Sequence, residues 1–141
     1  MCKYRITLTD SPDPEDVKLV REGLENFNTS MGVELDWVSL ATFVRDPDNN
    51  VVGGLTGGTY WGWLYVGLFW LAEDVRGQGL GDQLLARAEN EAKQRGCCHA
   101  FLDTTSFQAL PFYHKYGYTL YGQLDDFPPG HSRYFLKKEL V

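Results

Sequence analysis

The chain has 141 residues, of which 43% are hydrophobic and 23% charged, and these values predict one soluble globular domain over residues 1–141. The 13 basic and 19 acidic side chains give a net charge of −6, which argues against a nucleic-acid partner. The longest apolar run, Leu64–Ala72, is too short to span a membrane, and the first residues lack the apolar stretch of a signal peptide. We therefore expect a cytoplasmic protein without a membrane partner, and the scattered cysteines and histidines predict no metal site.

The first half of the chain predicts one helix among several strands. Residues 4–9 alternate in polarity and are rich in β-forming side chains, so they predict a first strand. Apolar residues between Val17 and Phe27 recur at helical spacing after a Pro-rich break. Further strands are expected at Trp37–Arg45, Val51–Tyr60 and Trp61–Leu71.

The second half predicts a helix over residues 82–95, which Gly96 ends. This helix lies between two apolar strands, so the strands before and after it should form a parallel pair by crossover. The remaining expected elements are a strand at Cys98–Asp103, a short helix at Ser106–Tyr116, and a hairpin formed by Tyr118–Leu124 and Ser132–Leu140.

The most informative segment is the glycine turn, residues 75–81, which follows an apolar strand and opens a helix. Glycines at 77, 79 and 81 remove side chains and permit dihedral angles that other residues resist. The unpaired N–H groups at the start of such a helix favour an anion, typically a phosphate. Asp82 and Gln83 follow the last glycine in place of Lys and Ser/Thr, which argues against an ATP-hydrolysing loop. The glycine spacing also differs from the dinucleotide-binding pattern.

Two motifs in this order resemble those of the GNAT (Gcn5-related) N-acetyltransferases. The spacing Arg76-x-x-Gly79-x-Gly81 is similar to the acetyl-CoA pyrophosphate loop of that family. The second motif is a short helix with an alanine, a tyrosine four residues later, and a Gly-Phe/Tyr end. It is matched here by Ala109, Tyr113, Gly117 and Tyr118. The resemblance covers about residues 51–140.

The resemblance implies an α/β (α+β mixed sheet) fold with about seven strands and about four helices. Two parallel strands would splay apart at one end, and acetyl-CoA would lie in the gap. A backbone N–H near the end of the strand before the glycine turn would polarise the acetyl carbonyl. The cofactor-binding residues that this implies are Phe69, Trp70, Leu71, Arg76, Gly77, Gln78, Gly79, Leu80, Gly81, Asp82 and Ser106. Because a serine reaches less far than the family's usual asparagine, Gln108 is an alternative to Ser106.

By the same resemblance, Tyr113 is the candidate general acid that protonates the departing thiolate. The alternative is a packing tyrosine with a satisfied hydroxyl. The general base is not identified by any motif. Trp61 and Trp63 are candidates for an aromatic wall that holds a cationic amine, or for ordinary sheet packing. Asp103, at a strand end, and His131, in a loop, are further candidates for acceptor binding.

The expected function is transfer of an acetyl group from acetyl-CoA to a primary amine by direct attack in a ternary complex. The acceptor could be a small amine, a protein lysine or a protein N-terminus. A non-catalytic acyl-CoA sensor or scaffold is the alternative, and the acyl length is left open. The resemblance also allows a homodimer through the last strands.

Overall fold

A computed structural model describes residues 3–141, which fall into two compact units that divide between Leu35 and Asp36. In the first unit, α1 (Pro14–Ser30) starts where the Asp13 carboxylate accepts a hydrogen bond from the Glu15 amide at 2.9 Å. The strand predicted at residues 4–9 is wrong, because the backbone there forms no ladder. An extended segment becomes a strand only when another strand pairs with its N–H and C=O groups, and the described part of this unit, residues 3–35, contains none. That residues 1–141 form a single domain stays a prediction.

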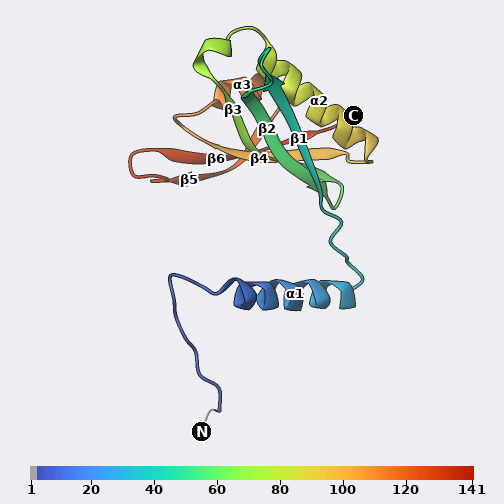
Figure 1. The fold of residues 1–141 in the computed structure, drawn as a ribbon, viewed down its shortest axis with the longest axis vertical. Helices are drawn as coiled ribbons and strands as arrows, with labels where there is room; N and C mark the ends of the chain where they lie inside the picture. Colours follow the sequence, from blue (N-terminus) through green and yellow to red (C-terminus); the bar gives the residue numbers. More distant parts are fainter. Residues whose placement is uncertain (1–2) are drawn as a thin grey trace. The chain divides into compact units, whose positions relative to one another are not determined.

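The second unit is built on a six-stranded sheet in the order β1-β2-β3-β4-β6-β5 (Figure 1). Only β3 and β4 are parallel, and the helix α2 connects them, as the sequence predicted. The mixed fold is therefore confirmed, with six strands in place of about seven and three α-helices in the described chain in place of about four. The strands are β1 (Val38–Arg45), β2 (Val51–Tyr60), β3 (Trp63–Leu71), β4 (His99–Thr105), β5 (Thr119–Asp125) and β6 (Ser132–Glu139). The helices are η1 (Glu73–Val75), α2 (Leu80–Gln94) and α3 (Leu110–Lys115).

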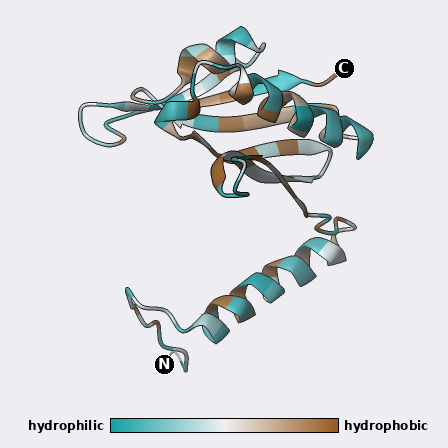
Figure 2. Cartoon of the chain, turned by 45° about the horizontal axis from the view of Figure 1, so that its top comes forward, coloured by the Kyte–Doolittle hydropathy of each residue, from teal (hydrophilic) through white to brown (hydrophobic). Residues whose placement is uncertain are grey.

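The hydrophobic core of this unit lies between the sheet and the two helices α2 and α3, which lie on the same side of it (Figure 1). Alternate strand residues point to this side, among them Leu55, Leu64 and Leu136, which are fully buried. They meet the apolar stripe of α2, whose opposite face is mostly polar (Figure 2). None of the helices in residues 3–141 is long and apolar enough to span a membrane.

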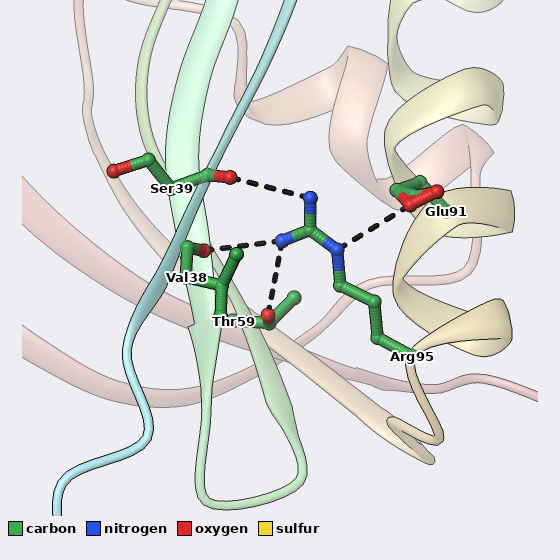
Figure 3. Close-up of polar contacts among 5 residues, drawn as sticks. All are labelled: Val38, Ser39, Thr59, Glu91 and Arg95. Atoms are coloured by element: carbon green, nitrogen blue, oxygen red, sulfur yellow. Dashed lines mark hydrogen bonds and ion pairs between the residues drawn. The ribbon is translucent and has the colours of Figure 1, made fainter.

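Arg95, the C-cap of α2, fixes the end of this helix to the edge of the sheet (Figure 3). Its Nη1 donates to the carbonyl of Val38 and to Oγ1 of Thr59, both at 3.1 Å, and its Nη2 donates to the carbonyl of Ser39 at 3.2 Å. Its Nε donates to Glu91 at 3.3 Å. One guanidinium thus connects α2 with β1 and β2, a contact that only a planar group with several donors can make.

We expect Arg95→Met to lower the free energy of unfolding by about 2 kcal/mol, because hydrogen bonds of a charged donor are lost and acceptors on β1 and β2 lose their partner. Urea denaturation measures this loss. Lys93→Met, in the same turn of α2 but without a side-chain hydrogen bond to the sheet within residues 3–141, is the matched control and should change stability by less than about 0.5 kcal/mol. Equal losses in the two variants would show that the charge near the helix end matters and the contacts of Arg95 do not.

Candidate active site

The site begins where β3 and β4 separate. Their parallel ladder runs from the pair Trp63–His99 to the pair Val66–Leu102 and then stops, although β3 continues to Leu71 and β4 to Thr105. A bulge in the β2–β3 ladder bends β3 away at this point. Gly57 pairs with Val66 and Thr56 pairs with Leu68, so Gly67 is the extra residue.

A cavity of about 420 Å³ lies beside this opening, between the end of β3, the glycine turn and α3. It is lined mostly by apolar surface, with a few polar groups that converge on it, as small-molecule sites usually are. Its lining residues are Phe69, Trp70, Leu71, Arg76, Gly81, Phe107, Gln108, Ala109, Phe112 and Tyr113. The structure therefore brings predicted cofactor residues and the predicted acid together in one cavity.

The glycine turn presents bare backbone at the start of α2. Gly77 and Gly79 have φ values of +77° and +76°, a conformation that favours glycine, and a Cβ on either would meet no atom within 4 Å. Gly79 is the N-cap of α2 and offers no side-chain acceptor. Within the described chain, the amides of Leu80 and Asp82 have no acceptor, so they are free to bind an anion.

Of the remaining predicted cofactor residues, Arg76 lines the cavity, whereas Gln78 and Ser106 do not. Arg76 lies at the rim, where its Nε donates to the Leu71 carbonyl at 2.9 Å, while Gln78 lies in the turn outside the cavity lining. Ser106 also lies outside it, because its hydroxyl accepts from the Ser132 amide at 3.1 Å and lies 3.3 Å from His131 Nδ1.

Gln108, the alternative to Ser106, does line the cavity. Its Oε1 accepts from Thr104 Oγ1 at 3.2 Å and from the Thr105 amide at 3.0 Å. Those two bonds orient the side-chain amide, and its NH₂ group has no partner within residues 3–141.

Tyr113 is the titratable group inside the cavity. Its side chain is 6% exposed and packs edge-on against the rings of Phe69 and Tyr118, at centroid distances of 6.2 and 5.9 Å. Burial, and then the negative charge of Asp103, raise the pKa of the phenol to about 12. Its hydroxyl has no hydrogen-bond partner among the described residues. A protonated donor without a protein partner is thus held in the cavity.

The predicted aromatic wall lies elsewhere. Trp61 and Trp63 line a second cavity of about 400 Å³, together with Tyr60, Phe101, Tyr121 and Lys137. Trp63 stands at the start of the β3–β4 ladder, stacked on His99 at 4.5 Å, three residues before the strands separate. The structure therefore does not place these tryptophans in the cavity of Tyr113.

Asp103 lies near the end of β4 and His131 in the loop before β6, and neither lines the cavity of Tyr113. Asp103 forms an ion pair with Arg133, a residue that the sequence did not indicate as functional. Arg133 could have been found from its position on β6, because β6 pairs with β4 and brings Arg133 beside Asp103. No group of three or more His, Cys, Asp or Glu side chains in the described chain could hold a metal ion.

Comparison with known proteins agrees with this geometry. The family model described as "Acetyltransferase (GNAT) family" matches residues 6–118. The chain belongs to the GNAT family of acetyltransferases. As a GNAT enzyme it belongs to the family that its two sequence motifs resemble.

Among the relatives of this GNAT acetyltransferase is acetyltransferase Atu2258 of Agrobacterium fabrum, 43% identical over 93% of this chain and 96% of that protein. The blasticidin-S acetyltransferase of Streptomyces morookaense is 42% identical over 71% of this chain and 74% of that protein. A crystal structure from Agrobacterium tumefaciens is 41% identical and superposes with a TM-score of 0.90, covering 96% of this chain and 99% of that one.

Proposed function

We propose that this acetyltransferase moves the acetyl group of acetyl-CoA to a primary amine of a small molecule, with both substrates bound at once. The observation that carries the proposal is the single cavity that holds Tyr113 at the strand opening and the glycine turn at its rim. The name of the Streptomyces relative supports a small molecule as the acceptor. Because the named relatives are enzymes, we prefer catalysis to a sensor or scaffold role.

The residues present fit acetyl-CoA. The unpaired amides of Leu80 and Asp82 suit its pyrophosphate, and the bare Cα positions of Gly77 and Gly79 let phosphate oxygens approach the backbone. The segment Phe69–Leu71 continues past the last ladder pair, so its backbone groups on the β4 side are open to the pantetheine arm. When bound, acetyl-CoA supplies an acetyl group on a thioester, which an unprotonated amine can attack.

Tyr113 would act as the general acid. Its raised pKa keeps the phenol protonated at neutral pH, so the hydroxyl can donate a proton to a departing thiolate. The surrounding rings bury the phenol, and its hydroxyl without a protein partner leaves the proton available. The free amides at the end of β3 are the groups that would stabilise an oxyanion.

The net charge of −6 would help to draw a cationic amine toward the protein before it loses its proton. A lysine or protein N-terminus remains the other acceptor class, and no contact in the described residues favours it. That the protein is cytoplasmic and that it forms a homodimer stay predictions.

The experiment that tests the cofactor compares thermal unfolding with and without acetyl-CoA. A ligand that binds only the folded state at 100 times its dissociation constant stabilises by about 2.7 kcal/mol, so the wild type should melt at a higher temperature. We expect Gly79→Trp to lose this shift, because the indole would occupy the space over the amides.

Gly96→Trp is the matched control. Gly96 has a φ of +88° and open space around it, but it lies at the other end of α2. Both variants should lose similar stability from backbone strain, and only Gly79→Trp should lose the acetyl-CoA shift. A wild type without any shift, or a full shift in Gly79→Trp, would refute the assigned cofactor site.

A further inference from the structure

The last residues of β4 present polar groups on the sheet face opposite α2. Side chains alternate along a strand, and Leu102 and Thr104 are buried on the α2 side, so Asp103 and Thr105 point the other way. Both lie beyond Leu102, the last residue of β4 that pairs with β3. They therefore border the same opening as the cavity of Tyr113, from its other side.

Arg133 fixes the orientation of the Asp103 carboxylate. Its Nε and Nη2 lie 3.0 and 2.8 Å from the same oxygen, Oδ1 of Asp103. The guanidinium itself lies over the rings of Phe127 and Phe135, at 4.8 and 5.2 Å from their centroids. Oδ2 of Asp103 has no hydrogen bond within residues 3–141. The contact of Oδ1 with Arg133 thus fixes the carboxylate, while Oδ2 is available to a ligand.

Thr105 carries a second unused polar group. Its Oγ1 is buried and has no hydrogen-bond partner in the described chain, where it is the one such side-chain atom. A buried hydroxyl without a partner is costly and requires an explanation, and a bound ligand is one. Asp103 and Thr105 are two positions apart on the strand, so their Cα atoms lie about 6–7 Å apart.

The charge of Asp103 reaches the phenols on both sides of the opening. Burial, and then the charge of Asp103, raise the pKa of Tyr65, on the open face of the sheet, and of Tyr113, in the cavity. This agrees with the position of Asp103 just beyond the last β3–β4 ladder pair, at the opening beside the cavity of Tyr113.

We propose that Asp103 binds the acceptor amine and takes its proton through Oδ2, that Arg133 positions this carboxylate, and that Thr105 binds a second polar group of the acceptor. This inference rests on the proposed function. It defines the acceptor as a small amine with a hydrogen-bonding group about 6–7 Å away. Because Asp103 and Arg133 together are neutral, the site holds the amine by a hydrogen bond and leaves its lone pair free to react.

The proton balance is complete for an acceptor that has already released its ammonium proton to water. The nitrogen–carbon bond forms and the carbon–sulfur bond breaks. The N–H proton passes to Asp103, and the Tyr113 proton passes to the sulfur. Exchange with water then returns both residues to their starting states, so no further reactant is needed.

The test measures steady-state thiol release with an amine that the wild type accepts, together with acetyl-CoA binding without amine. We expect Asp103→Asn to lower kcat/KM for the amine by about 100-fold or more, with the acetyl-CoA dissociation constant changed by less than about twofold. Asp103→Glu should restore part of the activity. Asp125→Asn is the matched control, since that carboxylate bonds only Gln123 and Ser132 on the exposed hairpin, and it should behave as the wild type.

Two further variants keep the proposal falsifiable if Asp103→Asn does not fold. Thr105→Val should raise KM for the amine at least about threefold, because the hydroxyl loses its ligand contact, without weakening acetyl-CoA binding. Arg133→Lys keeps the charge and should retain more activity than Arg133→Gln. Wild-type kinetics in Asp103→Asn, or in Thr105→Val where the first is unfolded, would overturn the inference. A wild type that acetylates no amine would overturn the proposed function itself.

Discussion

Tyr113→Phe should lower kcat for acetyl transfer by about 100-fold or more, which is the usual contribution of a positioned general acid. The phenol is the titratable group that lines the 420 Å³ cavity, apart from Arg76 at its rim. Its removal would leave a departing thiolate without a proton donor. Thiol release under saturating substrates measures kcat, and equilibrium binding of acetyl-CoA should change by less than about twofold, because the ring still fills its place.

The substitution should cost little stability, which separates a catalytic role from a packing role. The Tyr113 hydroxyl has no partner among residues 3–141, so phenylalanine leaves no unsatisfied group behind. The contacts with Phe69 and Tyr118 belong to the ring and are kept. Tyr121→Phe, the same change on exposed β5, should leave kcat unaltered. Equal rates for Tyr113→Phe and wild type would assign Tyr113 to packing.

The pH dependence of kcat is a separate expected result. Burial and the Asp103 charge raise the pKa of Tyr113 to about 12, so the protonated, active form of the acid persists well above pH 10. The rate should therefore rise with pH as amines lose their protons and should not fall through ionisation of Tyr113 below pH 10. A profile of kcat from pH 6 to 10 checks this, and a fall with a midpoint near pH 9 would contradict the assignment.

The sequence predicted the local features of the site well, because short-range geometry determines them. Gly77 and Gly79 adopt the left-handed backbone that their motif requires, and α2 starts directly after them. The parallel pair followed from one helix between two apolar strands. The strand expected at residues 4–9 failed for the opposite reason, since a strand depends on a partner that its own sequence does not specify.

The parts that could not be predicted depend on register. The sequence offered Trp61 and Trp63 as an aromatic wall for the acceptor. The position of the site depends instead on where the β3–β4 ladder stops, at Val66, three residues after Trp63. The pairing of Asp103 with Arg133 joins residues 30 positions apart in the sequence, and only the β4–β6 register brings them together. Ladder length and strand register depend on residues far apart in the sequence, so the local periodicity of hydrophobic residues does not determine them.

Gly57→Ala should have the largest effect on stability and on the shape of the site. A Cβ at this position would overlap the backbone carbonyl oxygen of Tyr65 and would stand 3.2 Å from the Gly67 nitrogen. Both neighbours are backbone atoms of the bulge, so no side-chain rotation can relieve the overlap. We expect the free energy of unfolding to fall by about 3 kcal/mol, the upper end of the range for overpacking, because backbone atoms cannot move aside as a side chain can.

Chemical denaturation measures the stability of Gly57→Ala, and acetyl-CoA binding reports whether its β3 bulge is kept. Gly122→Ala is the matched control, because a Cβ there meets the Phe135 side chain at an ordinary 3.7 Å and should change stability by less than about 0.5 kcal/mol. If the strand relaxes by losing the bulge, β3 can no longer bend away from β4, and acetyl-CoA binding should be lost even in folded protein. A Gly57→Ala variant with wild-type stability and wild-type acetyl-CoA binding would show that the bulge does not form the opening. Gly57→Ala therefore tests directly whether the bulge in β3 opens the sheet at the active site.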